Sequence, residues 1–321
     1  SLIAPGLLMA GLVAMAAQFL SDHYGAPVML MAILLGIPFQ FLSTEEKTAE
    51  GIAFASRTVL RVGVALLGVR VSVSMLADIG PAYAILVAVG VVVTIGLGVA
   101  VAPLFSRDRS FGFLVGGAVA ICGASAAMAI AALLPKGENR ERDLTFTVVS
   151  VTVASTLAMI AYPLITSSLG FDAKQSGVFL GGTIHDVAQV VGAGYSVSDE
   201  TGDISTLVKL FRVTMLAPVV FVGALILRNS APADKAPPLV PGFVIGFFVL
   251  AGLSSLGYIP QAAQQLMDTV SRACLVTAVA AVGMKTSIEQ LRKVGGSAIA
   301  MIAVLTLILA IFVLLGVQLL A

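Results

Sequence analysis

Long apolar stretches separated by short polar connectors run through the whole chain. A helix that crosses a bilayer needs about 20 mainly apolar residues, and most of these stretches reach or approach that length. The longest connector, from Arg228 to Pro238, is rich in proline and typical of a linker. The pattern predicts an all-α polytopic membrane protein with nine to eleven spans. The stretches lie at residues 4–20, 27–43, 53–69, 81–105, 111–134, 144–168, 178–197, 204–228, 239–258, 269–284 and 297–320.

One part of the chain recurs later with the same spacing of its polar residues. The segment 53–105 matches 269–320, and a weaker match relates 111–168 to 178–228 through a Gly-Gly pair in each. Repeats of this length predict structural units that resemble one another. The matched pairs of the first repeat are Ser56 and Ser271, Arg57 and Arg272, Gly68 and Gly283, and Arg70 and Lys285.

The stretch 111–134 contains small residues that are unusual for a lipid-facing helix. Gly123 and Ser125, at its centre, predict a break in the helix. Broken helices are tolerated at membrane depth only where protein or a watery cavity covers the free backbone. The N-terminus of a half-helix presents N–H groups and partial positive charge, which many transporters use to bind an anion. The alternative is a small-residue face for helix packing.

The stretch 178–197 places His185 and Asp186 side by side in apolar surroundings, with Gln189 one turn later. Ionisable residues at membrane depth are costly and usually mark an ion path or a proton relay. His185 titrates near neutral pH, and with Asp186 it is a candidate proton-coupling pair. The alternative is a solvated mouth in which Asp186 only caps a helix.

Five basic residues fall inside apolar stretches: Arg57, Arg61, Lys209, Arg212 and Arg272. Lys209 and Arg212 are neighbours on one helix face, where either could neutralise an anion or hold Asp186; alternatively, Lys209 snorkels to the interface. Arg57 and Arg61 begin the stretch 53–69. Because Arg57 is matched by Arg272 in the repeat, we favour a role in anchoring helix ends over contact with substrate.

Composition and charge support the membrane assignment. Hydrophobic residues make up 59% of the chain, charged residues 11%, and the mean hydropathy is +1.06, which excludes a soluble domain. The net charge of +1 gives no sign of a nucleic-acid partner. The two cysteines lie in apolar stretches, so no disulfide is expected. HExxH and CxxC motifs are absent from the sequence, so neither a metal site nor a cofactor is expected.

The distribution of loop charges bears on topology. If 111–134 and 178–197 re-enter on the side they came from, nearly all loop Lys and Arg residues gather on the cytoplasmic face, with Arg70 and Lys174 opposite. The single transmembrane domain, 1–321, then divides into antiparallel halves 1–170 and 171–321. Inverted repeats with discontinuous helices are typical of secondary transporters. The alternative is broken helices that cross fully.

Two motifs resemble a known family: Ala120-Ile-Cys-Gly-Ala-Ser125 up to Pro135, and Gly182-Thr-Ile-His185-Asp186 up to Gly194. They are similar to the YeiH family of bacterial inner-membrane proteins, which carries the label of sulfate exporter. This family is grouped with the bile acid/arsenite/riboflavin transporter superfamily. The resemblance implies an elevator-type carrier of sulfate or a related anion in the inner membrane, and elevators are commonly homodimers. The sodium-site cluster of bile-acid carriers has no clear counterpart here.

The leading hypothesis is a secondary active transporter of a small anion, coupled to H⁺ through His185 and Asp186, and not an enzyme. The alternatives are a passive anion channel, a sodium-coupled carrier of an organic anion, and an intramembrane enzyme using Ser125 or Cys122 with His185. The candidate substrate-binding residues are Cys122, Gly123, Ala124, Ser125, Gly182, Thr183, His185, Gln189 and Arg212.

Overall fold

The structure is a computed structural model that describes residues 3–24, 28–70, 79–134, 140–226, 242–285 and 296–320. All regular elements within these ranges are helices, and seven of those helices are long and apolar enough to cross a membrane. The prediction of an all-α, multi-pass membrane protein is therefore confirmed. The predicted linker from Arg228 to Pro238 lies outside the described residues.

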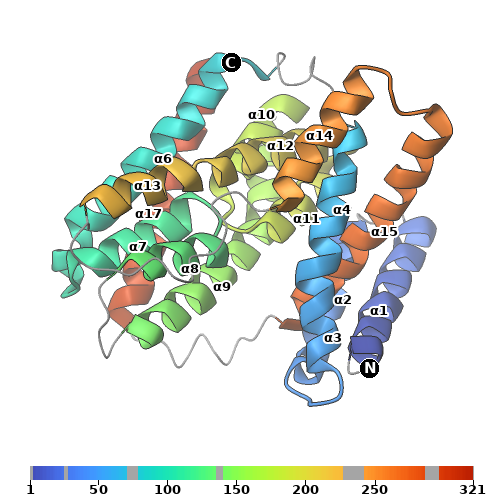
Figure 1. Cartoon of the computed structure of the whole chain (residues 1–321), viewed down its shortest axis with the longest axis horizontal. Coiled ribbons are helices and arrows are strands. Elements are labelled where there is room, and N and C mark those ends of the chain that lie inside the picture. The colour runs from blue at the N-terminus through green and yellow to red at the C-terminus, as the bar shows by residue number, and fades with distance from the viewer. Residues whose placement is uncertain are drawn as a thin grey trace.

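The helices form two lobes that lie side by side in Figure 1. The first, here called the panel lobe, combines helices from the beginning of the chain with two helices from its second half. Its long helix α15 packs on α1, α2 and α4. The elements of the panel lobe are α1 (Ile3–Tyr24), α2 (Val28–Gly36), η1 (Ile37–Ser43), α3 (Ala49–Phe54), η2 (Ala55–Val59), α4 (Leu60–Leu67), η3 (Gly68–Arg70), α14 (Gly242–Ser255) and α15 (Gln261–Lys285).

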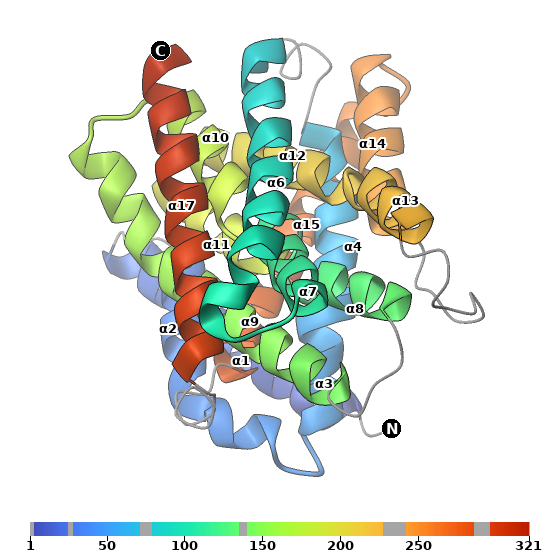
Figure 2. The same ribbon diagram turned by 90° about the vertical axis from the view of Figure 1, so that its left-hand side faces the viewer.

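The second lobe, here called the hairpin lobe, contains the two glycine-rich stretches. Its helices α6 and α17 stand side by side along one flank (Figure 2) and pack on α7. Across the boundary between the lobes, α11 packs against α2 and α15. The elements of the hairpin lobe are α6 (Pro81–Val101), η4 (Ala102–Phe105), α7 (Arg109–Ala120), α8 (Ala124–Leu133), α9 (Arg140–Ser168), α10 (Ala173–Thr183), α11 (Val187–Val197), α12 (Asp199–Thr214), α13 (Leu216–Ile226) and α17 (Gly296–Leu320).

Both glycine-rich stretches are broken helices, as the sequence predicts. The first half-helix of each pair is capped by an aspartate: Asp108 accepts from the N–H of Phe111 at 2.7 Å, and Asp172 accepts from the N–H of Gln175 at 2.7 Å. Between α7 and α8, Gly123 has φ 58° and ψ −121°, a conformation that L side chains rarely adopt. The glycine permits the sharp change of direction at the break.

Each broken helix folds back on itself as a hairpin. Thr201, near the start of α12, donates its N–H to Ser198 Oγ at 3.0 Å and its hydroxyl to the carbonyl of Ala173 at 3.4 Å. The start of α10 and the end of α11 therefore lie together. In the other hairpin, Phe113 of α7 and Leu133 of α8 lie against the same glycine, Gly223 of α13. In each pair, the outer ends of the two half-helices thus lie near one another, which is the arrangement that the re-entrant alternative predicts.

Candidate functional site

The turn between the two half-helices of each hairpin, residues 121–123 and 184–186, together with the helix ends beside it, is here called its tip. The two tips meet, and a buried arginine joins them. Arg212 of α12 is 0% exposed and donates to backbone carbonyls through all three of its nitrogens. Nε and Nη2 donate to the end of α7, with Ala120 O at 2.8 and 2.5 Å and Val119 O at 3.0 Å. Nη1 donates to the end of α10, with Gly181 O and Ile184 O both at 3.0 Å. These five bonds use all five guanidinium N–H groups, so Arg212 has none left for a ligand.

Lys209 and His185 complete the junction behind the tips. The ammonium of Lys209, 0% exposed, donates to Ile121 O at 2.7 Å and Ile184 O at 2.9 Å. His185 Nδ1 lies 3.0 Å from Val119 O, and its Nε2 lies 2.9 Å from the hydroxyl of Thr306. Because the last carbonyls of a helix lack partners and carry partial negative charge, buried cations stabilise both half-helix ends. Lys209 does not snorkel.

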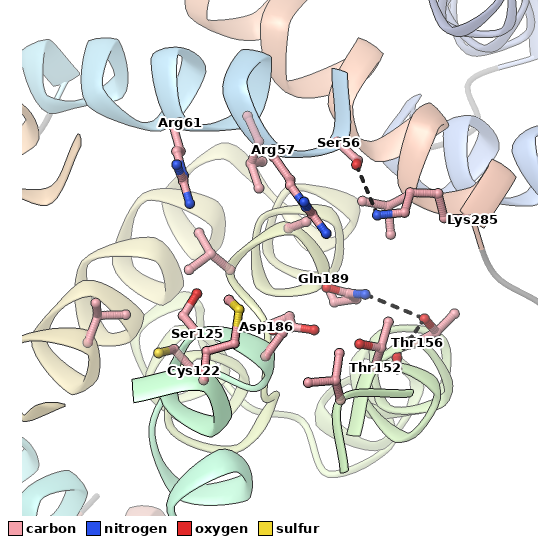
Figure 3. A pocket seen from close by; sticks show the side chains of 18 of the residues that line it. Ser56, Arg57, Arg61, Cys122, Ser125, Thr152, Thr156, Asp186, Gln189 and Lys285 are labelled. Atoms are coloured by element: carbon pink, nitrogen blue, oxygen red, sulfur yellow. Dashed lines mark hydrogen bonds between the residues drawn. The ribbon is translucent and has the colours of Figure 1, made fainter. Parts of the chain in front are cut away.

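A pocket of about 330 Å³ opens on the other side of the tips, between the two lobes. Figure 3 shows its two walls: Cys122, Ser125, Asp186 and Gln189 belong to the hairpin lobe, and Arg57 faces them from the panel lobe. The pocket thus lies at the boundary between the two lobes. The other polar or charged residues that line it are Ser56, Arg61, Thr152, Thr156 and Lys285.

The first turns of α8 and α11 form the hairpin wall of the pocket. The carboxylate of Asp186 accepts a hydrogen bond from the N–H of Ala124, the first residue of α8, and another from the hydroxyl of Thr152. One half-helix is thus capped by the tip of the other hairpin. Asp186 is also the N-cap residue of α11 but makes no side-chain cap there. Val187 and Ala188, at the start of α11, line the pocket, and N–H groups in a first helical turn have no partner within the helix.

Residues of α9 close one side of the pocket through a directional hydrogen-bond chain. The hydroxyl of Thr156 donates to Thr152 O at 3.0 Å, so its oxygen is free to accept from Gln189 Nε2 at 3.5 Å. This orients the amide of Gln189, which is 2% exposed, and its Oε1 has no hydrogen-bond partner. The side chain therefore keeps an unused acceptor beside the pocket.

Three cationic side chains form the panel wall. Arg57 lies in η2, a single π-helical turn that interrupts the run from α3 to α4, and Arg61 follows one turn later. Lys285 ends α15 and donates to Ser56 Oγ at 3.4 Å. All three cations are exposed, so the pocket opens to solvent on this side. π-Helical turns frequently occur at functional sites because they re-aim side chains within a helix.

The structure brings together only part of the site that the sequence predicts. Cys122, Ala124, Ser125, Asp186 and Gln189 line the pocket. The other predicted residues do not line it, and they pack behind or beneath the tips: Gly123 against Asp186, Gly182 against Val87 and Val313, Thr183 on Phe179 O, and His185 and Arg212 on the tip carbonyls.

The sequence interpretation missed the panel wall. It favoured an anchoring role for Arg57 and gave Lys285 no role beyond its place in the repeat. Both residues line the pocket. The signal that could have found them is the repeat itself, because it marks Ser56, Arg57 and Lys285 as matched positions. Among the described residues, no group of three His, Cys, Asp or Glu side chains could hold a metal ion.

Comparisons with known proteins agree on one family. The family model described as "Conserved hypothetical protein 698" matches residues 5–303. A protein named "UPF0324 membrane protein TauZ" from Paracoccus pantotrophus is 58% identical, over 98% of this chain and 95% of that protein. A UPF0324 membrane protein from Rhizobium meliloti is 54% identical, over 97% of this chain and 92% of its own length. No solved structure matches the chain significantly.

Proposed function

Because this chain belongs to the YeiH-type family of UPF0324 membrane proteins, we propose that it is a secondary active carrier of a small anion. Sulfate, other sulfur oxyanions and sulfonates are the first candidates for its substrate. The label of the YeiH family suggests sulfate, and the other candidates share its anionic sulfur–oxygen group.

The observation that carries this proposal is the opposition of two positive walls across the pocket. The uncapped first turn of α11 lies on one wall, and Arg57, Arg61 and Lys285 lie on the other. Helix N-termini and arginines are the groups that proteins use most to bind oxyanions. A volume of about 330 Å³ suits a small molecule rather than a polymer. We therefore place the anion between α11 and the panel cations.

Alternating access would come from movement of the hairpin lobe against the panel lobe. In support, the pocket lies at the boundary between the lobes, and each lobe contains helices from both predicted halves. Relative sliding would carry the hairpin tips and the bound anion past the panel, as in an inverted-repeat elevator. Of the exposed cations, Lys285 belongs to the loop charges predicted on the cytoplasmic side, so the structure corresponds to an inward-open state under this proposal.

We assign proton coupling to Asp186 alone. Its carboxylate lines the pocket, beside the site proposed for the anion, whereas both ring nitrogens of His185 already have partners behind the tips. Protonation of a carboxylate beside an anion removes a like charge, which favours binding of the anion and the proton together.

The test is uptake of radiolabelled sulfate, sulfite, thiosulfate and taurine into proteoliposomes, with and without a pH gradient. A carrier shows saturable flux and is accelerated by unlabelled substrate on the opposite side. Non-saturable flux without counterflow would indicate a channel instead. Arg57→Gln, Arg61→Gln and Lys285→Gln should each raise the half-saturating concentration about tenfold, since a hydrogen bond to a charged group contributes about 1.5–3 kcal/mol.

Lys47→Gln is the control for these variants. It removes one positive charge from the exposed loop before α3, and Lys47 is not among the residues that line the pocket. Its half-saturating concentration should match that of the wild type. If Lys47→Gln and Arg57→Gln change the half-saturating concentration equally, the panel cations act only through the general surface charge and do not belong to the binding site.

A further inference from the structure

The repeat predicted from the sequence gives the panel lobe a second pair of cations like the one in the pocket. Arg57 and Lys285 stand at the pocket, one from each copy of the repeat. Their repeat mates, Arg272 and Arg70, also stand together, because both approach Asp199 and Asp268. Each pair thus combines the early arginine of one repeat with the late basic residue of the other.

The two pairs lie at different depths along the same helix. Arg272 and Lys285 both belong to α15, and their separation of thirteen positions corresponds to about 20 Å of helix. Arg272 lies near the middle of this spanning helix, yet its side chain is 47% exposed. Charged groups at such a depth face water rather than lipid. We therefore expect the second pair to be in contact with water, and neither arginine lines the pocket.

The second pair already binds carboxylates of the hairpin lobe. One oxygen of Asp199, at the start of α12, lies 2.8 Å from Arg272 Nη2 and 3.7 Å from Arg70 Nη2. Asp203, one turn later and only 8% exposed, lies 3.5 Å from Arg70 and accepts the hydroxyl of Tyr195. A single carboxylate oxygen that bridges two guanidinium groups occupies the place that an oxyanion would take.

We propose that Arg70 and Arg272 form a second anion-binding subsite, on the far side of the panel lobe from the Arg57–Lys285 pair. This rests on the proposed carrier function. In the present state, Asp199 and Asp203 of α12 fill the subsite and hold the lobes together on that side, and Asp268 of α15 lies 3.5 Å from both arginines. When the hairpin lobe moves, the two carboxylates leave with α12, and the arginines bind the transported anion before its release. The ligand class is a small oxyanion, the same class as in the pocket.

The test compares the two faces of the membrane. Transport of radiolabelled sulfate, or of taurine if its wild-type flux is larger, is measured with right-side-out and everted membrane vesicles. Arg272→Gln and Arg70→Gln should raise the half-saturating concentration at least tenfold for anion offered from the predicted periplasmic side, and less than twofold from the cytoplasmic side. Arg57→Gln should show the opposite asymmetry. A merely structural role would change both directions equally.

A double variant keeps both arginines and removes the negative charge of the two hairpin-lobe carboxylates that they bind. Asp199→Asn with Asp203→Asn should lower the half-saturating concentration from the periplasmic side, because an amide competes with the anion less well than a carboxylate does. Arg107→Gln, which removes a charge paired with Asp143 in the hairpin lobe at 3.6 Å, is the control. Equal effects from both sides, or none, for the Arg70, Arg272 and aspartate variants would overturn the subsite. If the wild-type protein transports neither sulfate nor taurine, the proposed carrier function is wrong, and the subsite proposal fails with it.

Discussion

The carboxylate of Asp186, on the tip of one hairpin, accepts a hydrogen bond from the N–H of Ala124, on the tip of the other. This contact links the two half-helix N-termini that face the pocket. It also means that one of the two is already occupied by an anion that belongs to the protein. Under the proposed function, a substrate anion and the Asp186 carboxylate are neighbours, and the charge of one must affect the binding of the other.

Replacement of Asp186 by Asn should separate transport from the pH gradient. The amide oxygen can still accept from Ala124, so the tip should keep its shape and the protein its thermal stability. Because Asn cannot take up a proton, counterflow should persist while gradient-driven accumulation falls to the level without a gradient. Both are measured in proteoliposomes. Accumulation that still follows the pH gradient in the Asn variant would show that another group carries the proton.

Gly123→Ala tests the tip geometry. Gly123 has a positive φ of 58°, and an added Cβ would overlap the carboxylate of Asp186. Backbone strain of this kind costs about 1–3 kcal/mol, and the displaced carboxylate should no longer cap α8. We expect flux below a tenth of wild type and a lower melting temperature. Gly96→Ala, in helix α6 with open space around its Cβ position, is the control and should leave both unchanged.

Arg212 should matter for folding more than for substrate affinity. Its five bonds satisfy carbonyls at the ends of α7 and α10, and lysine has only three N–H donors. Arg212→Lys should therefore cost about 2–5 kcal/mol of stability. Thermal unfolding in detergent and the fraction of monodisperse protein on size exclusion measure this loss. A variant of normal stability with weakened anion binding would place Arg212 in the substrate site instead.

These residues show what the sequence could and could not predict. The breaks at Gly123 and before Asp186 were predictable, since glycine interrupts a helix and an ionisable residue is costly inside an apolar stretch. A buried cation such as Arg212 signals importance, but its partner is either a ligand or the backbone, and only packing decides which. The Arg57 wall was equally hidden, because it meets Asp186 only through the packing of α2 and α15 on α11.

The accessibility of Cys122 gives a last test of the positive pocket. This thiol lines the pocket but is only 5% exposed, and replacing Cys274 by Ser leaves it as the single cysteine. A methanethiosulfonate reagent with a sulfonate tail should react with Cys122 faster than one with a trimethylammonium tail of similar size. The panel cations attract the former and repel the latter. Mass spectrometry of the labelled protein gives both rates.

Two comparisons make this labelling specific. Arg57→Gln should reduce the preference for the sulfonate reagent several-fold, because one of the three panel cations is lost. Saturating substrate should slow both reagents, since the bound anion would occupy the space in front of Cys122. Faster reaction with the cationic reagent would mean that the Asp186 carboxylate, and not Arg57, Arg61 and Lys285, sets the potential inside the pocket, and the anion would then have to bind elsewhere.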